Sequence, residues 1–253
     1  MNYPLLAVET TGPFASVALK DAQGNIHSQM LEEKLNHLKG LLPLTDKVLK
    51  SAQLEISQVK TIAVSQGPGS FTGIRIGISS VRSLAQITGA KVIGVPTLET
   101  FVYNNPMYRG IVCPMFDARM EQMYAGAFIL KDGKVNTLVA TNSYPPAEYF
   151  NLLSKVIDEN SKKFGTPLDF RFFGDGLGIF EQNIIHWSAR LKKDYFNGFS
   201  LEMEETNKLQ NARSALKWAE AYGQEKDFYE IYPIYVRKAE AQRRLDEKNG
   251  CQK

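Results

Sequence analysis

The stretch from residue 65 to residue 77 combines residue types that could bind an anion. It reads Ser-Gln-Gly-Pro-Gly-Ser-Phe-Thr-Gly-Ile-Arg-Ile-Gly, and it lies between the apolar run 61–64 and a long amphipathic segment. This order predicts a sharp strand-to-helix turn. Glycine has no side chain, so it allows backbone N–H groups to approach a phosphate closely. The same glycines would equally allow two helices to pack very close together.

The residues that would complete a phosphate or nucleophile site are missing from this stretch. No Lys-Ser or Lys-Thr pair follows the glycines, as it would in a Walker A loop. Ser70 does not lie in a Gly-x-Ser-x-Gly elbow, because Pro68 takes the place of the first glycine. The histidines His27, His37 and His186 are far apart in the sequence, so no pair has metal-ligand spacing. We therefore expect neither a nucleophilic enzyme nor a metal site.

The overall composition is that of an ordinary globular protein. The chain has 253 residues, of which 43% are hydrophobic and 23% charged, so it can form one large or two small domains. The net charge of +3 is spread along the chain, so any contact with RNA would be local or shared with a partner. The chain starts without basic residues, contains no apolar run near the roughly 18 residues of a membrane span, and has only Cys113 and Cys251 as cysteines. We therefore expect a reducing, cytoplasmic location and no membrane partner.

The elements that would position these residues occur twice in the same order. The residue pattern of each half of the chain predicts a three-stranded meander, then an amphipathic helix, then a buried strand that leads into a glycine turn. In the first half these are strands 5–8, 15–19 and 26–30, helix 35–51, strand 61–65 and helix 74–88, with strand 92–95 and a short helix 97–103 after them. In the second half they are strands 110–116, 123–130 and 135–140, helix 146–157 and strand 170–173.

This repetition predicts a duplicated α/β fold with two lobes, each containing a mixed sheet flanked by helices. The lobes would span residues 1–105 and 106–238, and a charged tail would follow at 239–253. A last amphipathic helix at 212–224 could pack back on either lobe.

A duplicated fold whose lobes each open with an acidic, hydroxyl-rich hairpin turn resembles the ASKHA superfamily of actin, hexokinase and heat-shock proteins. Several segments narrow this resemblance to the bacterial TsaB (YeaZ) family, and they follow one another in order over most of the chain. They are residues 6–11, His37 followed by 41–43, 67–77, 94–98, 174–176 and 233–238.

The resemblance implies a role in making threonylcarbamoyladenosine, the modified base beside the anticodon of tRNAs that read codons starting with A. In that family TsaB pairs with the catalytic subunit TsaD, acts with the ATPase TsaE, and does not perform the transfer itself. We therefore expect a non-catalytic scaffold or activator with a TsaD-like and a TsaE-like partner. The chain alone would form a homodimer, and it would contact tRNA only indirectly or weakly.

The positions that match the catalytic relative's active site carry unsuitable residues. The two metal-binding histidines, four residues apart, correspond to Thr97 and Phe101, and phenylalanine has no donor atom. The second phosphate-binding turn corresponds to residues 117–120, which contain no glycine. We expect no metal, no cofactor and at most weak ATP binding by the isolated chain. The possible vestigial nucleotide loops contain Glu9, Thr10, Asp117, Gly174 and Gly176.

The helix that follows the glycine turn carries two different stripes. Thr72 is the expected N-cap. Ile74, Ile78, Val81 and Ala85 form an apolar stripe suited to the sheet of the same lobe, whereas the neighbouring stripe contains small residues. Gly77 costs about 1 kcal/mol relative to alanine, so its presence needs a reason. The reason is close packing either inside the lobe or against another subunit.

The resemblance favours a subunit interface, in which this helix and helix 35–51 meet the same pair of a homologous chain as a four-helix bundle. His37 is then a partly exposed structural or interface histidine. Arg75 lies in a first helical turn, where the dipole disfavours a cation, and its expected counter-charge is Glu9, a partner carboxylate or an RNA phosphate. The predicted interface contains His37, Leu38, Leu41, Leu42, Thr45, Gly73, Arg75, Gly77, Ser80 and Leu84.

The alternative function is that of an ASKHA phosphotransferase or ATPase acting alone. It requires ATP to bind between the lobes despite the second turn without glycine. A metallopeptidase is a third possibility, and it fails because the metal ligands are missing.

Overall fold

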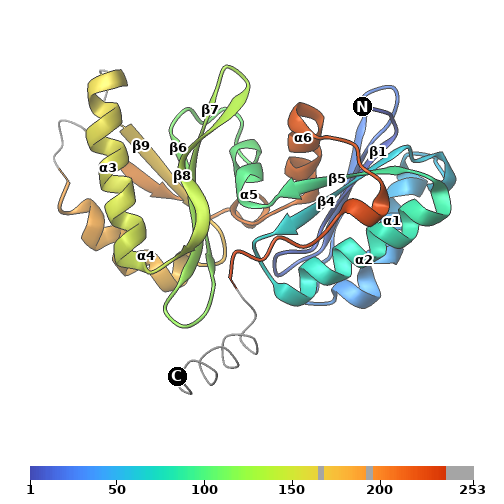
Figure 1. Ribbon diagram of the computed structural model, residues 1–253, viewed down its shortest axis with the longest axis horizontal. Coiled ribbons are helices and arrows are strands. Elements are labelled where there is room, and N and C mark those ends of the chain that lie inside the picture. The colour runs from blue at the N-terminus through green and yellow to red at the C-terminus, as the bar shows by residue number, and fades with distance from the viewer. Residues whose placement is uncertain (165–167, 192–195, 238–253) are drawn as a thin grey trace, which may run out of the picture.

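Two five-stranded mixed sheets form the two lobes of the computed structural model, which describes residues 1–164, 168–191 and 196–237 (Figure 1). The strand orders are β3-β2-β1-β4-β5 and β10-β9-β6-β7-β8. Both sheets therefore have an antiparallel meander on one side and two parallel strands on the other. The predicted duplicated α/β fold is confirmed.

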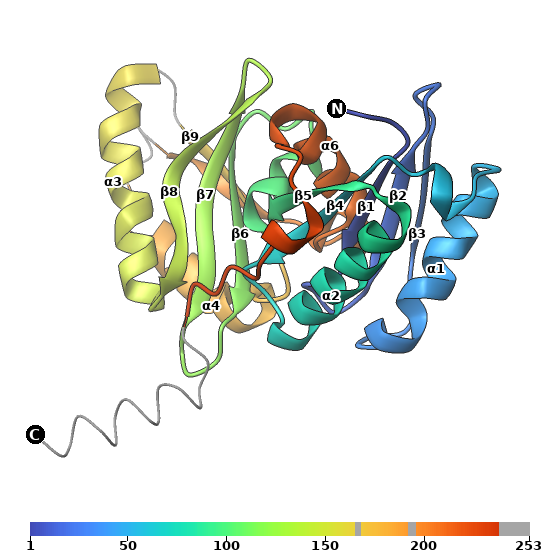
Figure 2. The same ribbon diagram turned by 45° about the vertical axis from the view of Figure 1, so that its right-hand side comes forward.

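The first sheet is covered by helices on both faces because its strands are apolar on both faces. Leu6 and Val8 point to α1 and α2, whereas Leu5 and Ala7 point to α6. Figure 2 shows α1 and α2 side by side on one face and α6 on the other. The elements of this lobe are β1 (Leu5–Glu9), β2 (Ser16–Lys20), β3 (Ile26–Met30), α1 (His37–Ser51), η1 (Ile56–Gln58), β4 (Thr61–Gly67), α2 (Phe71–Thr88), β5 (Lys91–Pro96) and α6 (Ala212–Tyr222).

Small residues bring α6 close to the first sheet. Ala18 and Ala63 of the strands meet Ala212, Ala215 and Ala219 of the helix in one buried cluster. The last helix of the chain thus packs against the first lobe, and residues 97–110 and 202–211 connect the two lobes.

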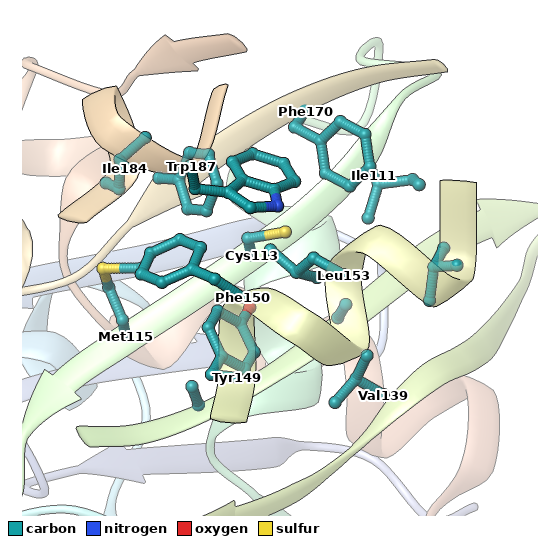
Figure 3. Packing of buried hydrophobic residues seen from close by; sticks show 14 of the residues in the cluster. Ile111, Cys113, Met115, Val139, Tyr149, Phe150, Leu153, Phe170, Ile184 and Trp187 are labelled. Atoms are coloured by element: carbon teal, nitrogen blue, oxygen red, sulfur yellow. The ribbon is translucent and has the colours of Figure 1, made fainter. Parts of the chain in front are cut away.

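The second lobe has an aromatic core on the face covered by α3 and α4 (Figure 3). The Trp187 ring lies 5.6 Å from the Phe150 ring and 5.3 Å from the Phe170 ring, measured between centroids. Cys113 is buried in this core. The elements of this lobe are β6 (Ile111–Asp117), β7 (Met123–Lys131), β8 (Lys134–Tyr144), α3 (Pro146–Phe164), β9 (Leu168–Phe173), α4 (Leu177–Ser188) and β10 (Phe196–Leu201).

Within the described ranges, three short helices besides η1 lie in the connections. They are η2 (Leu98–Tyr103), α5 (Glu205–Lys208) and η3 (Phe228–Glu230). The side chains of η2 cover the face of the second sheet that is opposite α3 and α4.

The start of α2 differs from the sequence prediction. The helix begins at Phe71, and the Ser70 hydroxyl accepts a hydrogen bond from the Gly73 N–H at 3.2 Å. Ser70 is therefore the N-cap, and the prediction of Thr72 is wrong. Residues 239–253, including Cys251, lie outside the described residues. Within the described ranges, no helix combines the length and apolar character needed to cross a membrane.

Candidate partner surface and the loops between the lobes

The turn after β1 is occupied by contacts from its own chain. Glu9 is fully buried, and its carboxylate accepts hydrogen bonds from the Thr11 N–H, the Thr11 hydroxyl and the Ser65 hydroxyl. Burial raises the pKa of Glu9 above its ordinary value, although these hydrogen bonds oppose the shift. The Thr10 hydroxyl donates to the Gly73 carbonyl at 2.8 Å. Glu9 and Thr10 thus connect β1 to β4 and α2.

The turn between β6 and β7 satisfies its own backbone. The Ala118 N–H donates to the Gln122 carbonyl at 3.0 Å, and the Gln122 N–H donates to the Arg119 carbonyl at 3.2 Å. The Arg119 N–H donates to Asp117 Oδ1 at 2.8 Å, and its guanidinium forms an ion pair with the same carboxylate. These three N–H groups are therefore not available to a phosphate.

Arg237 approaches the same turn from the C-terminal segment. Its guanidinium donates to the Ala118 carbonyl at 2.6 Å and to the Arg119 carbonyl at 3.2 Å. Arg119, Met120 and Glu121 have φ values of 63°, 52° and 57°, a conformation that residues other than glycine rarely adopt. The turn thus presents carbonyl oxygens to a cation of its own chain, whereas a phosphate-binding turn presents N–H groups.

The glycines after β9 serve backbone packing. The Gly174 N–H donates to the Lys208 carbonyl at 2.8 Å, and the Gly176 N–H donates to the Met115 carbonyl at 3.1 Å. A Cβ atom at Gly174 would overlap the Met115 carbonyl oxygen, and its φ of +105° also favours glycine. A tight turn accounts for both glycines.

The positions that match the metal ligands of the catalytic relative belong to the protein core. The Phe101 ring lies 5.6 Å from the Phe116 ring and 5.8 Å from the Phe173 ring. Thr97 is buried at the end of β5. Among the residues that the structure describes, no group of three or more His, Cys, Asp or Glu side chains could hold a metal ion.

The glycines of α2 face the first lobe and not a partner. A Cβ atom at Gly73 would overlap the Thr10 carbonyl oxygen, and one at Gly77 would overlap the Thr10 hydroxyl. Both glycines are buried. Their assignment to the subunit interface is therefore wrong, because their small size lets α2 approach the turn after β1.

Three residues of α1 in the predicted interface are also buried inside the lobe. The His37 Nε2 atom forms a 2.9 Å hydrogen bond with the Gly12 carbonyl, and burial lowers the pKa of this imidazole. Leu41 lies in the core, and the Thr45 hydroxyl donates to the Leu41 carbonyl. The prediction of a partly exposed His37 is wrong, and the structure corrects the interface assignment of all three residues.

The remaining residues of the predicted interface reach the surface to different degrees. Leu38 is 77% exposed and Leu42 55% exposed, whereas Ser80 and Leu84 of α2 are half-buried. Leu35, two residues before the start of α1, is also exposed. We call Leu35, Leu38 and Leu42 the α1 edge. Exposed leucines in such a group are typical of a protein-binding surface.

Arg75 is exposed, and it does not meet Glu9. Its Nε donates to the Tyr235 hydroxyl at 2.9 Å, and its guanidinium lies 3.9 Å from the centroid of the Phe71 ring. The prediction that Glu9 balances this cation is wrong, since the Glu9 carboxylate is enclosed by Ser65 and Thr11.

The partner of Arg75 belongs to a segment whose position against α2 was not predicted from the sequence. Residues 231–237, which we call the strap, run from α2 toward the second lobe (Figure 2). Ile231 is buried in the first lobe, and the Ile234 N–H donates to the Gln66 carbonyl at 2.9 Å. A Cβ atom at Gly67 would lie 2.8 Å from the Ile234 carbonyl oxygen. Gly67 therefore accommodates the strap, and no local pattern indicates this pairing.

A protein-family model matches residues 29–244 of the chain, and its description is TsaD, tRNA N6-adenosine threonylcarbamoyltransferase. The tRNA threonylcarbamoyladenosine biosynthesis protein TsaB of Bacillus subtilis (strain 168) is 28% identical over 60% of this chain and 66% of its own length. The TsaB of Escherichia coli (strain K12) is 33% identical over 47% of this chain and 52% of its own length. The matched part thus spans about half to two thirds of these relatives.

Two solved structures share the fold. One, from Pseudomonas aeruginosa, is described as an uncharacterized protein with similarity to peptidase YEAZ. It is 25% identical, with a TM-score of 0.71, over 92% of this chain and 99% of that one. The other, YeaZ from Pseudomonas aeruginosa, is 24% identical, with a TM-score of 0.70, over 91% and 98%.

Proposed function

The chain belongs to the TsaD family of the tRNA N6-adenosine threonylcarbamoyltransferase, and we propose that it is a non-catalytic activator subunit for threonylcarbamoyl transfer to tRNA. Its resemblance to the TsaB (YeaZ) proteins is confirmed by several relatives of that name. In the proposal, the chain activates a TsaD-like catalytic subunit and acts with a TsaE-like ATPase. The target is the adenosine beside the anticodon of tRNAs that read codons starting with A.

The hydrogen bonds of the turn between β6 and β7 are the main support for a non-catalytic role. Its Ala118 and Arg119 carbonyls hold the Arg237 guanidinium, and its N–H groups are used within the turn. A nucleotide phosphate would have to displace these contacts to find donors there. The core position of Phe101 supports the same conclusion, because a phenylalanine packed against other rings supplies no metal ligand.

The α1 edge is the proposed contact with the homologous catalytic subunit. Leu38 and Leu42 lie one helical turn apart and are exposed, as expected for one stripe of a helix bundle. In the absence of the catalytic subunit, the same surface would pair two copies of this chain. Burying one leucine contributes about 1.5–3 kcal/mol, so these two side chains could supply much of a micromolar affinity.

Reconstituted tRNA modification tests the activator role directly. The catalytic subunit, the ATPase and a tRNA are assayed with and without this chain, and we expect modification to depend on it. An unchanged rate without the chain would overturn the proposal. Calorimetry of the isolated chain with ATP and magnesium distinguishes the activator from an ATPase acting alone. Tight binding of ATP would favour the ATPase, since that function requires it.

A double substitution tests the surface. Leu38→Glu with Leu42→Glu should weaken capture of the catalytic subunit by about 100-fold, because it places two charges in the buried contact. The matched control is Ile179→Glu on α4, which changes a similarly exposed residue, 58% accessible, on the other lobe. Equal capture by the double variant and the control would reject the α1 edge as the interface.

A further inference from the structure

A cavity of about 450 Å³ lies beside α6 at the junction of the two lobes. The strands β2 and β3 form one wall, and the first half of α6 forms the other. Both connections between the lobes also line it, through Asn104 and Asn207. Its volume falls in the range of small-molecule sites, which is about 300–1,000 Å³.

Two cations on α6 line this cavity without a counter-ion. Arg213 and Lys217 are four residues apart, and neither forms an ion pair with any described residue. No aspartate or glutamate is among the residues that line the cavity. Like charges at this spacing repel, and a cation in the first turn of a helix opposes the helix dipole. Arg213 is exposed and Lys217 is half-buried, so water solvates both cations, and an anion in the cavity would relieve their repulsion further.

The hydroxyl group of a buried serine on α6 also lines the cavity. Ser214 is 2% exposed and lines the cavity, and within the described part of the chain its hydroxyl has no hydrogen-bond partner. This differs from Ser16, whose hydroxyl accepts from the Ala212 N–H. Because Ser214 lines the cavity and its hydroxyl bonds to no described residue, this hydroxyl is available to a bound molecule.

We propose that this cavity binds a small phosphate monoester. The Arg213 guanidinium, the Lys217 ammonium and the Ser214 hydroxyl together offer more donors than the two oxygens of a carboxylate can use. A phosphate monoester offers three terminal oxygens and up to two negative charges, which match two cations. This site is separate from the turns after β1 and β6, and it does not depend on the proposed role in tRNA modification.

Calorimetry of the isolated full-length chain with AMP, and separately with inorganic phosphate, tests the proposal. We expect both to bind. Arg213→Gln and Lys217→Gln should each weaken AMP binding by about tenfold, because each removes one charge-assisted contact. The matched control is Lys155→Gln on α3 of the other lobe, which should leave binding unchanged.

Thermal melting provides a second measurement. The same substitution that weakens AMP binding should stabilise the chain in the absence of ligand. Without ligand, Arg213→Gln should raise the melting temperature, because it removes a repulsion and an unfavourable dipole interaction. AMP should raise the melting temperature of the unsubstituted chain, and it should raise that of Arg213→Gln by less. The proposal is overturned if neither AMP nor phosphate binds at millimolar concentration. It is also overturned if a variant that combines Arg213→Gln with Lys217→Gln binds AMP as the unsubstituted chain does. Binding of an RNA oligonucleotide but not of AMP would also overturn the proposal that the ligand is a small molecule.

Discussion

Replacing Gly73 by alanine distinguishes internal packing from a subunit interface. Gly73 lies in the first turn of α2, and Gly178 occupies a comparable place in the first turn of α4. A Cβ atom at Gly178 would meet nothing within 4 Å, whereas one at Gly73 would overlap the Thr10 carbonyl oxygen. The two substitutions have the same effect on helix propensity, so any difference between them reports the surroundings.

The structure predicts effects of opposite sign. Alanine gains about 0.5 kcal/mol over glycine from the unfolded chain and from helix propensity, and Gly178→Ala should show this gain alone. At Gly73 the obstacle is backbone, so α2 must move away from the turn, and such overpacking costs about 2 kcal/mol. The move also weakens the hydrogen bond from the Thr10 hydroxyl to the Gly73 carbonyl, worth about 1 kcal/mol. Gly73→Ala should therefore lose about 2.5 kcal/mol of stability.

Urea denaturation followed by circular dichroism measures both effects, with self-association measured in parallel by analytical ultracentrifugation. Gly73→Ala should shift the transition to lower urea, and Gly178→Ala should shift it slightly higher. A Gly73→Ala variant that is as stable as the unsubstituted chain but associates less would refute the reasoning. That result would mean that the glycine serves a partner helix after all.

Three further outcomes follow from other contacts. Arg237→Ala should speed amide hydrogen exchange in the turn between β6 and β7 by about tenfold, because the Ala118 and Arg119 carbonyls lose their donor. Unchanged protection would mean that Arg237 does not stabilise this turn. Burial raises the folded pKa of Glu9 above 4.5, so the folded state holds this proton more tightly and the free energy of unfolding falls as pH rises through the folded pKa. Glu9→Gln should remove that slope in urea titrations that start near pH 4.5, the unfolded pKa, and run upward. Tyr222→Phe removes the acceptor of the Val135 N–H and should cost about 1 kcal/mol in the same assay, and an unaffected midpoint would show that this contact between α6 and β8 is dispensable.

The order of elements was predictable because its signals are local. Alternating apolar residues and glycine turns mark β1, β2 and β3, and the same pattern returns for β6, β7 and β8. The stripe Ile74, Ile78, Val81 and Ala85 was predicted to face the sheet, and these residues are buried there. Two second-lobe elements, α4 and β10, were not located from the sequence. Strand β10 contains Gly198 and lies at a sheet edge, so its pattern is weak.

The side to which each small residue points was not predictable from spacing. A stripe at three- and four-residue intervals marks one side of a helix, but it does not say whether that side meets its own lobe or another chain. The answer for Gly73 and Gly77 depends on Thr10, more than sixty residues away in sequence. For the same reason, one predicted interface combined Leu41, which is buried, with Leu38, which is exposed.

The glycine-rich stretch of residues 65–77 lets the turn after β1 and the strap lie close to the start of α2. This close approach explains why the composition of the stretch resembles that of a phosphate site. Gly67 leaves room for the strap, and Gly69 lies against the Thr11 carbonyl, where a Cβ atom would be 2.6 Å away. Close approach of backbone is the property that glycine supplies in both cases, whether the approaching group is a phosphate or a peptide. Composition therefore identifies a place of close contact, and only the three-dimensional neighbours identify the contacting group. Since those neighbours here are the turn after β1 and the strap, the stretch connects parts of the first lobe and positions α2 beside α1.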